Sequence, residues 1–301
     1  MSEVAMQHAH LVVADVCCGL ENVAIPAHSD VEGTLLSDIK YTPTNVAGPG
    51  APTDPSEIMY EGCDCQTPSC STDCPCILRY GPTYDKTGCL LTEELEKTFR
   101  SKPILECNTS CQCGEPCSNR VAQKGVSLKL EVFRAPHKGW GVRAAERIPL
   151  GRFVCEYAGE VLGLEEAKKR TQNMKKEDMN YILTLREHVA SGNIIETHID
   201  PTYIGNVGRY INHSCSPNLL MLPVRVDSEV PKLALFAGKD IEVGEELSFD
   251  YSGEYGNVVN QGNLQKVTGQ SKDSSKLKPC FCGSEMCTGF LPFDPSLYQV
   301  H

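Results

Sequence analysis

Short segments in which apolar and polar side chains alternate run through the chain from residue 126 to residue 251. Val126, Leu128, Leu130 and Val132 alternate with mostly polar neighbours, which predicts a strand with one apolar face. Further strands are predicted over 152–157, 181–186, 194–199, 219–226, 233–237 and 246–251. One helix is predicted over 164–176, where acidic residues come early and basic residues late, as the helix dipole favours. Many short strands and few helices predict a mostly β fold, a β-rich α+β arrangement of small sheets.

The flanking regions lack this periodicity. Residues 1–40 are expected to form a variable, loosely structured arm, and the Pro-, Gly- and Thr-rich stretch 41–55 an extended linker. The Gly-, Asn-, Gln- and Ser-rich stretch 256–278 is expected to be a flexible linker. The predicted domains are an N-terminal arm at 1–40, a cysteine-rich module at 41–125, a central domain at 126–252, and a linker with a second cysteine module at 253–301.

No apolar run approaches the roughly 18 to 20 residues that a membrane span requires. The most apolar early segment, 11–18, contains Asp15 and follows no basic stretch, so it is a poor signal peptide. We therefore expect an intracellular protein with no membrane partner, in which thiols stay reduced. Clustered cysteines in such a protein indicate bound metal more than disulfides.

Nine of the 17 cysteines form a first cluster in two halves, C-x-C-x4-C-x3-C-x-C and C-x3-C-x-C-x3-C. They are Cys63, Cys65, Cys70, Cys74, Cys76, Cys107, Cys111, Cys113 and Cys117. A structural zinc ion takes four ligands, so nine thiolates exceed two sites and fall short of three separate ones. Six terminal and three bridging thiolates would satisfy three zinc ions. An iron–sulfur or redox-sensing role is the alternative, and Cys89 is left over.

The second cluster, Cys280, Cys282 and Cys287, offers only three ligands. Such a site is either open and catalytic, or it takes its fourth ligand from elsewhere in the chain. Cys215 is the best candidate for that ligand, and it would tie the C-terminal segment back onto the central domain. We expect both clusters to hold zinc structurally, so that chelation unfolds this part of the protein.

The formal net charge is −11. This charge argues against sequence-independent nucleic-acid binding, which depends on Lys and Arg side chains that neutralise phosphates. It suits a basic partner such as a Lys- and Arg-rich tail, although acidity also serves solubility alone.

The cysteine-rich module, the β-rich centre and the C-x-C-x4-C end together resemble the pre-SET, SET and post-SET segments of histone lysine methyltransferases. The resemblance covers about residues 58 to 293 and rests on four central motifs: Lys138–Gly141 (KGWG), Glu156–Glu160 (EYAGE), Gly208–Cys215 (GRYINHSC) and Glu246–Tyr251 (ELSFDY). It implies a SET-domain fold of small curved sheets with a pseudoknot, in which the C-terminal strand threads beneath residues 212–215. A three-zinc pre-SET module and a one-zinc post-SET module would flank it.

Four further stretches, 41–43, 48–50, 200–206 and 290–294, resemble one branch of this family, in which the methyltransferase is followed by a mariner transposase. The present chain ends at His301, so we expect neither DNA cleavage nor sequence-specific DNA binding from it.

The resemblance implies transfer of a methyl group from S-adenosyl-L-methionine to a lysine amine. Tyr251 matches the catalytic tyrosine, Tyr157 a wall of the lysine channel, and Phe249 the position at which the family has Phe or Tyr. A phenyl ring at Phe249 lacks the hydroxyl that would bind the amine or a water molecule, which predicts di- or trimethylation. The alternatives are a strand-capping role for Tyr251 and plain core packing for Tyr157.

Seven residues match the family's cofactor-binding positions: Lys138, Gly139, Trp140, Tyr181, Arg209, Asn212 and His213. The alternatives are a general base at His213 and a structural ion pair at Arg209. Many relatives have an aromatic residue five positions after the last cysteine, where this chain has Pro292, so Phe290 or Phe293 is expected to substitute.

The implied substrate is the histone H3 tail or nucleosome in nuclear chromatin, bound as an added strand in an acidic groove. The branch resemblance favours dimethylation at tail position 36. Tail position 9, other basic peptides or non-histone proteins are alternatives, as is a catalytically silent zinc-rich scaffold for chromatin or repair proteins.

Overall fold

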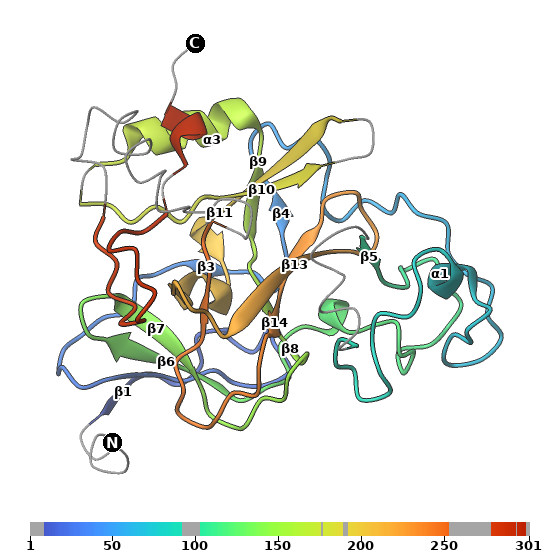
Figure 1. Ribbon diagram of the computed structural model, residues 1–301, viewed down its shortest axis with the longest axis horizontal. Helices are drawn as coiled ribbons and strands as arrows, with labels where there is room; N and C mark the ends of the chain where they lie inside the picture. The colour runs from blue at the N-terminus through green and yellow to red at the C-terminus, as the bar shows by residue number, and fades with distance from the viewer. Residues whose placement is uncertain are drawn as a thin grey trace.

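The computed structural model describes residues 9–91, 103–175, 177–188, 192–252, 278–292 and 294–298. Its described residues are mostly strands, arranged in four small sheets (Figure 1). The cysteine-rich segment around helix α1 (Pro75–Leu78) lies at one end of the molecule, and the cysteines near the C-terminus lie on the opposite side of the central sheets. This arrangement confirms the predicted β-rich fold. No helix in the described part of the chain is long and apolar enough to cross a membrane.

Two sheets build the centre of the domain. One has the order β5-β13-β14-β8, where β5 is Ile104–Leu105, β13 Leu219–Arg225, β14 Lys232–Ala237 and β8 Phe153–Glu156. The other has the order β10-β11-β9-β4, where β10 is Leu183–His188, β11 Ile194–Gly205, β9 Gly159–Leu162 and β4 Val46–Ala47. The strands predicted near 152, 181, 194, 219 and 233 are therefore confirmed. The predicted strand at 246–251 shortens to β15, Ser248–Phe249.

The predicted helix is confirmed as α3, Leu164–Asn173. It ends at Asn173, three residues earlier than predicted, and the next residue, Met174, has an extended backbone; Lys176 lies outside the described residues. The Arg170 guanidinium fixes the helix to two strands, because its Nη1 lies 2.8 Å from both a Glu160 and an Asp200 carboxylate oxygen. The Asp200 side chain is almost fully buried, so this ion pair is one of the internal restraints on α3.

The expectation of a loosely structured N-terminal arm is wrong for residues 9–40. Strands β1 (His10–Val13) and β2 (Ala27–Ser29) join β6 (Leu130–Ala135) and β7 (Gly139–Ala144) in a sheet, and Ile25 is fully buried. The connecting loop is organised by Asp15, whose carboxylate accepts hydrogen bonds from the backbone N–H groups of Cys17, Gly19 and Ile25. Such a loop is ordered by hydrogen bonds to one carboxylate and not by a periodic pattern of apolar residues. The hydrophobic pattern of the sequence therefore did not predict that residues 9–40 are ordered.

The stretch 41–55 is extended, as predicted, but it is not a free linker. Strands β3 (Lys40–Tyr41) and β4 pair in parallel with β11 and β9, and Tyr41 is buried with its hydroxyl donating to Glu21 at 2.9 Å. Gly48 is required there, because a Cβ atom would lie 2.8 Å from the Leu162 side chain. The predicted linker 256–278 lies outside the described residues, apart from Lys278.

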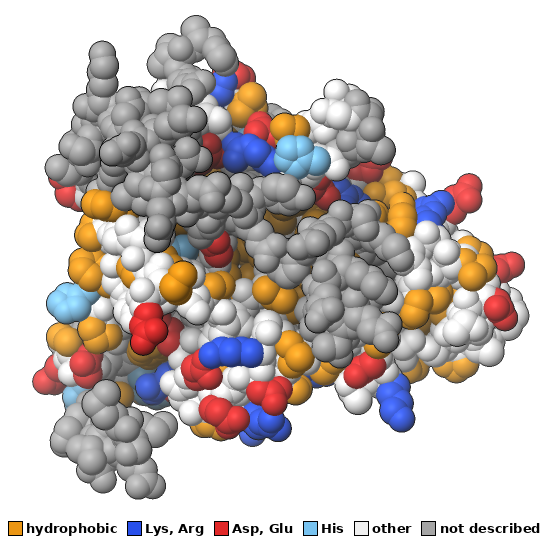
Figure 2. All heavy atoms as spheres, in the orientation of Figure 1, with side chains coloured by type: hydrophobic (Ala, Val, Ile, Leu, Met, Phe, Trp, Pro, Cys, Tyr) orange, Lys and Arg blue, Asp and Glu red, His pale blue; other side chains and the backbone are white. Residues whose placement is uncertain are grey.

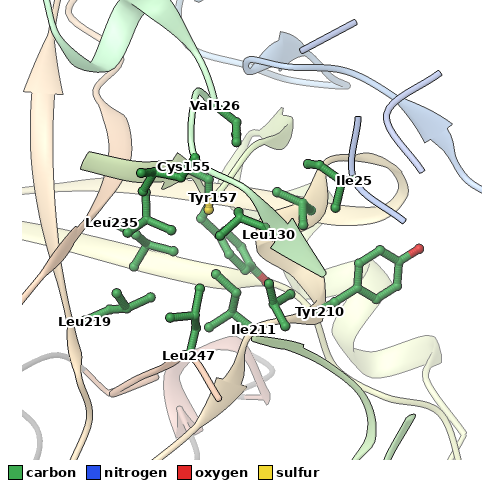
Figure 3. Close-up of a cluster of buried hydrophobic side chains, with 14 of the residues drawn as sticks. Ile25, Val126, Leu130, Cys155, Tyr157, Tyr210, Ile211, Leu219, Leu235 and Leu247 are labelled. Carbon is green, nitrogen blue, oxygen red and sulfur yellow. The ribbon is translucent and has the colours of Figure 1, made fainter. Parts of the chain in front are cut away.

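The strand predicted from Val126 begins later, at Leu130, although Val126 and Leu128 are buried. Their side chains belong to the main core, in which Figure 3 shows Cys155 of β8, Leu219 of β13 and Leu235 of β14 on one side. A second, smaller core lies between the cysteine-rich segment and β8, next to the 3-10 helix η2 (Ala122–Lys124). These cores join the N-terminal half of the chain to the central domain.

Strand β12 (Asn212–His213) pairs in parallel with β15, so that His213 lies opposite Phe249. The Ser214 N–H group extends the pairing by donating to the Phe249 carbonyl at 3.1 Å. Residues 212–214 and 248–251 therefore lie side by side, as the predicted pseudoknot requires. The 3-10 helix η3 (Val207–Tyr210), which leads into β12, is buried throughout.

Candidate active site

A cavity of about 1090 Å³ lies between β7, the end of α3, the segment 209–213 and the C-terminal cysteine loop. All seven predicted cofactor residues line it, and so does Tyr251. The cavity is at the upper end of the size range of small-molecule sites. The structure thus brings together residues from five separate stretches of the sequence, which is the arrangement that the predicted site demands.

Lys138, Gly139 and Trp140 form the turn at the start of β7 on one side of the cavity. Gly139 has φ +83°, a left-handed conformation that glycine adopts without strain. Lys138 Nζ lies 2.6 Å from a Glu246 carboxylate oxygen, and the other oxygen of Glu246 accepts from the Asn212 amide at 3.0 Å. Glu246 therefore joins the turn to β12. Glu246 stands in the ELSFDY motif, but the motif by itself predicted no role for it.

Arg209 and Tyr181 form another side. The guanidinium of Arg209 stacks on the Tyr181 ring at 4.3 Å and on the Tyr210 ring at 4.9 Å, and its Nε donates to the Pro201 carbonyl. Arg209 is 6% exposed and forms no ion pair with a carboxylate of the described residues. Its Nη1 donates to the Ser37 hydroxyl at 3.3 Å, and the structural ion pair considered for it is not observed among the described residues.

Tyr251 lies where β15 meets β12. Its hydroxyl donates to the Ile211 carbonyl at 2.8 Å, and its backbone N–H donates to Nδ1 of His213 at 3.2 Å. Burial, and secondarily the neighbouring Tyr181, raise the pKa of the Tyr251 phenol, so it is a neutral hydroxyl at physiological pH. His213 is buried between Tyr251 and Cys215, whose Sγ lies 3.4 Å from Nε2. Both ring nitrogens of His213 thus face protein groups.

Phe249 and Tyr157 do not line the cavity but lie directly behind Tyr251. The Phe249 ring is fully buried, 4.8 Å from the Tyr251 ring and 5.8 Å from the Tyr157 ring. Tyr157 donates its hydroxyl to the Tyr181 carbonyl at 2.5 Å, and burial holds the pKa of its phenol well above the usual value. The three aromatic side chains form an apolar wall. Its only polar side-chain atoms are the hydroxyl groups of Tyr157 and Tyr251, and both are neutral.

The nine cysteines of the first cluster gather at one place, and no two of the 17 cysteines form a disulfide. Their sulfur atoms form three groups of four, each with all sulfurs within 4.8 Å of one another: 63/70/107/113, 63/65/70/74 and 63/76/107/111. Cys63 belongs to all three groups, and Cys70 and Cys107 to two each. Shared thiolates are what the predicted bridging ligands require, although Cys117 is in none of these groups. Cys117 lies beside them, with its Sγ 4.0 Å from that of Cys107.

The donor set fits zinc. Sites with four sulfur ligands are typical of zinc or iron–sulfur centres, and zinc is the usual structural ion. Polar groups also support thiolate ligands, because the Asn108 N–H donates to Cys111 Sγ at 3.3 Å and Arg120 donates to Cys113 Sγ at 3.6 Å. Cys89 lies outside the cluster, as expected.

The second cluster takes Cys215 as its fourth member. The sulfur atoms of Cys215, Cys280, Cys282 and Cys287 all lie within 4.8 Å of one another, which confirms the predicted return of the C-terminal segment to residue 215. The set is closed and tetrathiolate, so it fits a structural zinc ion and not an open catalytic one.

The aromatic residue that closes this side was not foreseen. Phe281, between two of the cysteines, lines the cavity and contacts the His137 ring at a centroid distance of 5.6 Å. Phe290 is half-exposed and does not line the cavity, and Phe293 lies outside the described residues. The sequence offered one sign of this aromatic residue, because Phe281 stands between the ligand cysteines Cys280 and Cys282.

Comparison with known proteins agrees with this geometry. A SET domain profile matches residues 139–252 and a Pre-SET motif profile matches residues 17–120. The fold, the cysteine clusters and the shared cavity are those of a zinc-binding SET-domain enzyme. The chain belongs to the SET-domain histone-lysine methyltransferases.

Within this family the chain is similar to the histone-lysine N-methyltransferase SETMAR. It is 52% identical to the mouse protein over 287 residues, which cover 95% of this chain and 91% of that protein. The crystal structure of the human SETMAR methyltransferase domain has a TM-score of 0.78 and 46% identity, covering 94% of this chain and 98% of that one. The branch resemblance predicted from residues 41–43, 48–50, 200–206 and 290–294 is therefore confirmed.

A more distant structure is that of KRYPTONITE in complex with mCHH DNA, an H3(1–15) peptide and SAH. It has a TM-score of 0.69 and 28% identity, and the match covers 97% of this chain and 55% of that one.

Proposed function

We propose that this protein transfers methyl groups from S-adenosyl-L-methionine to a lysine of the histone H3 tail in the nucleus. The observation that supports this most is the single cavity that all seven expected cofactor residues share with Tyr251. The KRYPTONITE complex, which holds both SAH and an H3 peptide, supports the same pairing of cofactor and substrate. The proposed site residues are those that the family resemblance assigned.

When bound, S-adenosyl-L-methionine supplies an electrophilic methyl group on a cationic sulfonium. The attacking lysine must be neutral, and its free pKa near 10.4 makes deprotonation at pH 7 cost roughly 4 to 5 kcal/mol. Tyr251 lines the cavity with the rings of Phe249 and Tyr157 packed behind it, and this apolar backing favours the neutral amine by desolvation. The Tyr251 hydroxyl, held by the Ile211 carbonyl, is in place to orient the amine. No carboxylate base is needed.

Strand β10 lies at the edge of its sheet among the described strands, so an extended peptide has a backbone edge to pair with there. The net charge of −11 favours a basic peptide. On the face shown in Figure 2, acidic and basic side chains are interspersed, which is unlike a surface built to bind nucleic acid. We infer dimethylation at H3 position 36 as the preferred outcome from the similarity to SETMAR, with position 9 as the second candidate.

The test is incubation of the protein with methyl-labelled S-adenosyl-L-methionine and each core histone, an H3 tail peptide, or nucleosomes. We expect label in H3, and mass spectrometry of the product names the lysine and the number of methyl groups. Absence of label from every substrate, with the cofactor bound, would favour the zinc-rich scaffold instead.

The number of methyl groups is expected to depend on Phe249. In Phe249→Tyr the added hydroxyl can bind the lysine amine or a water molecule in the space that added methyl groups need. The product should therefore change from di- or trimethyl-lysine to mainly monomethyl-lysine, as measured by mass spectrometry over a time course. Phe290→Tyr is the matched control, because Phe290 is half-exposed and does not belong to the wall of Tyr157, Phe249 and Tyr251. An identical product distribution for both variants would remove Phe249 from product control.

A further inference from the structure

Residues 294–298, which follow the C-terminal cysteine loop, pack against β10 and α3. The Nη2 atom of Arg186, on β10, donates to the Asp294 carboxylate at 2.7 Å and to the Ser296 hydroxyl at 2.8 Å. The Nε atom of the same guanidinium donates to the Glu196 carboxylate at 2.7 Å. Asp294 in turn accepts from the backbone N–H and hydroxyl of Ser296. Residues 294–296 are thus fixed to the edge strand by one guanidinium.

Leu297, the residue after Ser296, supplies the apolar part of this contact. Leu297, in the 3-10 helix η5 (Pro295–Tyr298), is 2% exposed and packs in a small cluster with Leu162, Ala167 and Ile182. Figure 1 shows η5 beside α3, on the far side of the C-terminal cysteine loop from β7. This cluster is separate from the main core, and in it Leu297 packs the tail against α3 and β9.

The C-terminal cysteine loop, residues 278–292, also has contacts of its own with the rest of the domain. Cys215 shares the four-sulfur group, Phe281 contacts His137, and the Lys278 ammonium donates to the Asp178 carbonyl. Leu291 and Tyr298, on either side of the docked residues 294–297, both line the cavity. Residues of 278–292 and 294–298 therefore both line the cavity, and the last of them are attached to α3 and β10.

We propose that residues 294–298 act as a clasp that keeps the cysteine loop closed over the cofactor cavity, with Arg186 and Leu297 as positioning residues. The inference rests on the proposed function, since it assumes that the cavity binds S-adenosyl-L-methionine. Neither residue lines the cavity, so both act through the segment that does. Opening of the clasp exposes the cofactor, and its strength sets how long the cofactor stays bound.

The two halves of the clasp differ in their physical nature. Although burial alone would raise it, the pKa of Asp294 is lowered by the hydrogen bonds from Arg186 and Ser296, so the ion pair is formed at neutral pH. Both side chains are about one-third exposed, so salt screens their attraction. The burial of Leu297 is apolar and does not depend on ionic attraction.

The cofactor product S-adenosyl-L-homocysteine is the probe, and Trp140 is the reporter. Trp140 is the only tryptophan in the chain and lines the cavity, so its fluorescence follows occupancy. Removal of residues 294–301, or Leu297→Ala, should raise the Kd and the dissociation rate about tenfold. Arg186→Gln should raise them about threefold at low salt and leave them near wild type in 1 M NaCl, whereas the Leu297→Ala effect should persist in high salt.

Glu196→Gln is the matched control, because it removes a carboxylate partner of Arg186 but leaves the bond to Asp294. It should bind the probe like the wild type, and Arg186→Lys should restore part of the affinity lost in Arg186→Gln. Thermal unfolding and zinc content measured on every variant separate the clasp from a folding defect.

A Kd within twofold of wild type for both the truncation and Leu297→Ala would overturn the clasp and leave the proposed function standing. Loss of affinity that follows loss of zinc in both variants would also overturn it, because the tail would then act on the zinc site. If the zinc-loaded wild-type protein does not bind the probe at all, the proposed function fails with it.

Discussion

Replacement of Tyr251 by phenylalanine is expected to lower kcat for methyl transfer roughly a hundredfold to a thousandfold, the usual effect of removing one well-placed polar group from an active site. The Tyr251 hydroxyl belongs to the one residue of the aromatic wall that lines the cavity, and it donates to the Ile211 carbonyl at 2.8 Å, which fixes its direction. Cofactor affinity should change little, because the phenyl ring keeps its contacts with Phe249 and His213. Labelled-methyl transfer measures kcat, and Trp140 fluorescence measures binding of S-adenosyl-L-homocysteine.

The matched control for this change is Tyr203→Phe, because Tyr203 is 70% exposed on β11 and away from the cavity. It should keep wild-type kcat. Turnover of Tyr251→Phe close to that of the control would show that the hydroxyl takes no part in the reaction. A loss of turnover accompanied by an equal loss of cofactor affinity would assign Tyr251 to binding instead.

Replacement of Cys107 by serine is expected to prevent folding of the cysteine-rich module. Cys107 is fully buried and belongs to two of the three four-sulfur groups, so its loss breaks more than one zinc site. Structural zinc contributes about 10 to 16 kcal/mol in zinc-finger peptides, which is as large as the whole stability of a typical domain, about 5 to 15 kcal/mol. Zinc content per chain and circular dichroism of the purified protein measure the effect, and a strong chelator should reproduce it on the wild type.

Two other cysteines supply the controls. Cys89 is buried but outside every four-sulfur group, so Cys89→Ser should keep the full zinc content. Cys215→Ser should lose a single zinc ion and weaken cofactor binding while the first cluster remains intact, because Cys215 belongs only to the C-terminal group. Equal zinc content in Cys107→Ser and the wild type would contradict the shared-ligand arrangement.

Local sequence pattern predicted much of the central domain. The helix at 164 and the strands near 183, 194, 219 and 232 follow the pattern closely, because each is long enough for its period to be visible. The pattern missed the pairing of 10–13, 27–29, 40–41 and 46–47, since strands of two to four residues show no period. Residues 27–29, 40–41 and 46–47 take their place in the fold from partners more than 100 residues away along the chain, and 10–13 pair with 27–29.

The candidate site divides in the same way. Its cofactor and catalytic positions came from motifs, and these lie around one cavity. The sequence did not predict the roles of Glu246 and Phe281 or the Arg186–Asp294 contact. Each depends on a contact with a residue more than 100 positions away in the sequence.

By itself the sequence determined the chemical inventory of this protein: twelve cysteines with ligand spacing and Cys215 as a candidate thirteenth ligand, the aromatic residues of the wall, and the periodic strands that form the core. These are properties of neighbours along the chain, where spacing and residue type are visible directly. The tertiary structure alone decided which of these groups meet: which thiolates are shared, that the N-terminal segment belongs to the central sheets, and that residues 294–298 return to α3 and β10. Those contacts depend on packing and strand pairing between segments that are distant in the sequence. A local sequence pattern cannot predict them, because it does not contain the free energy of contacts between distant segments.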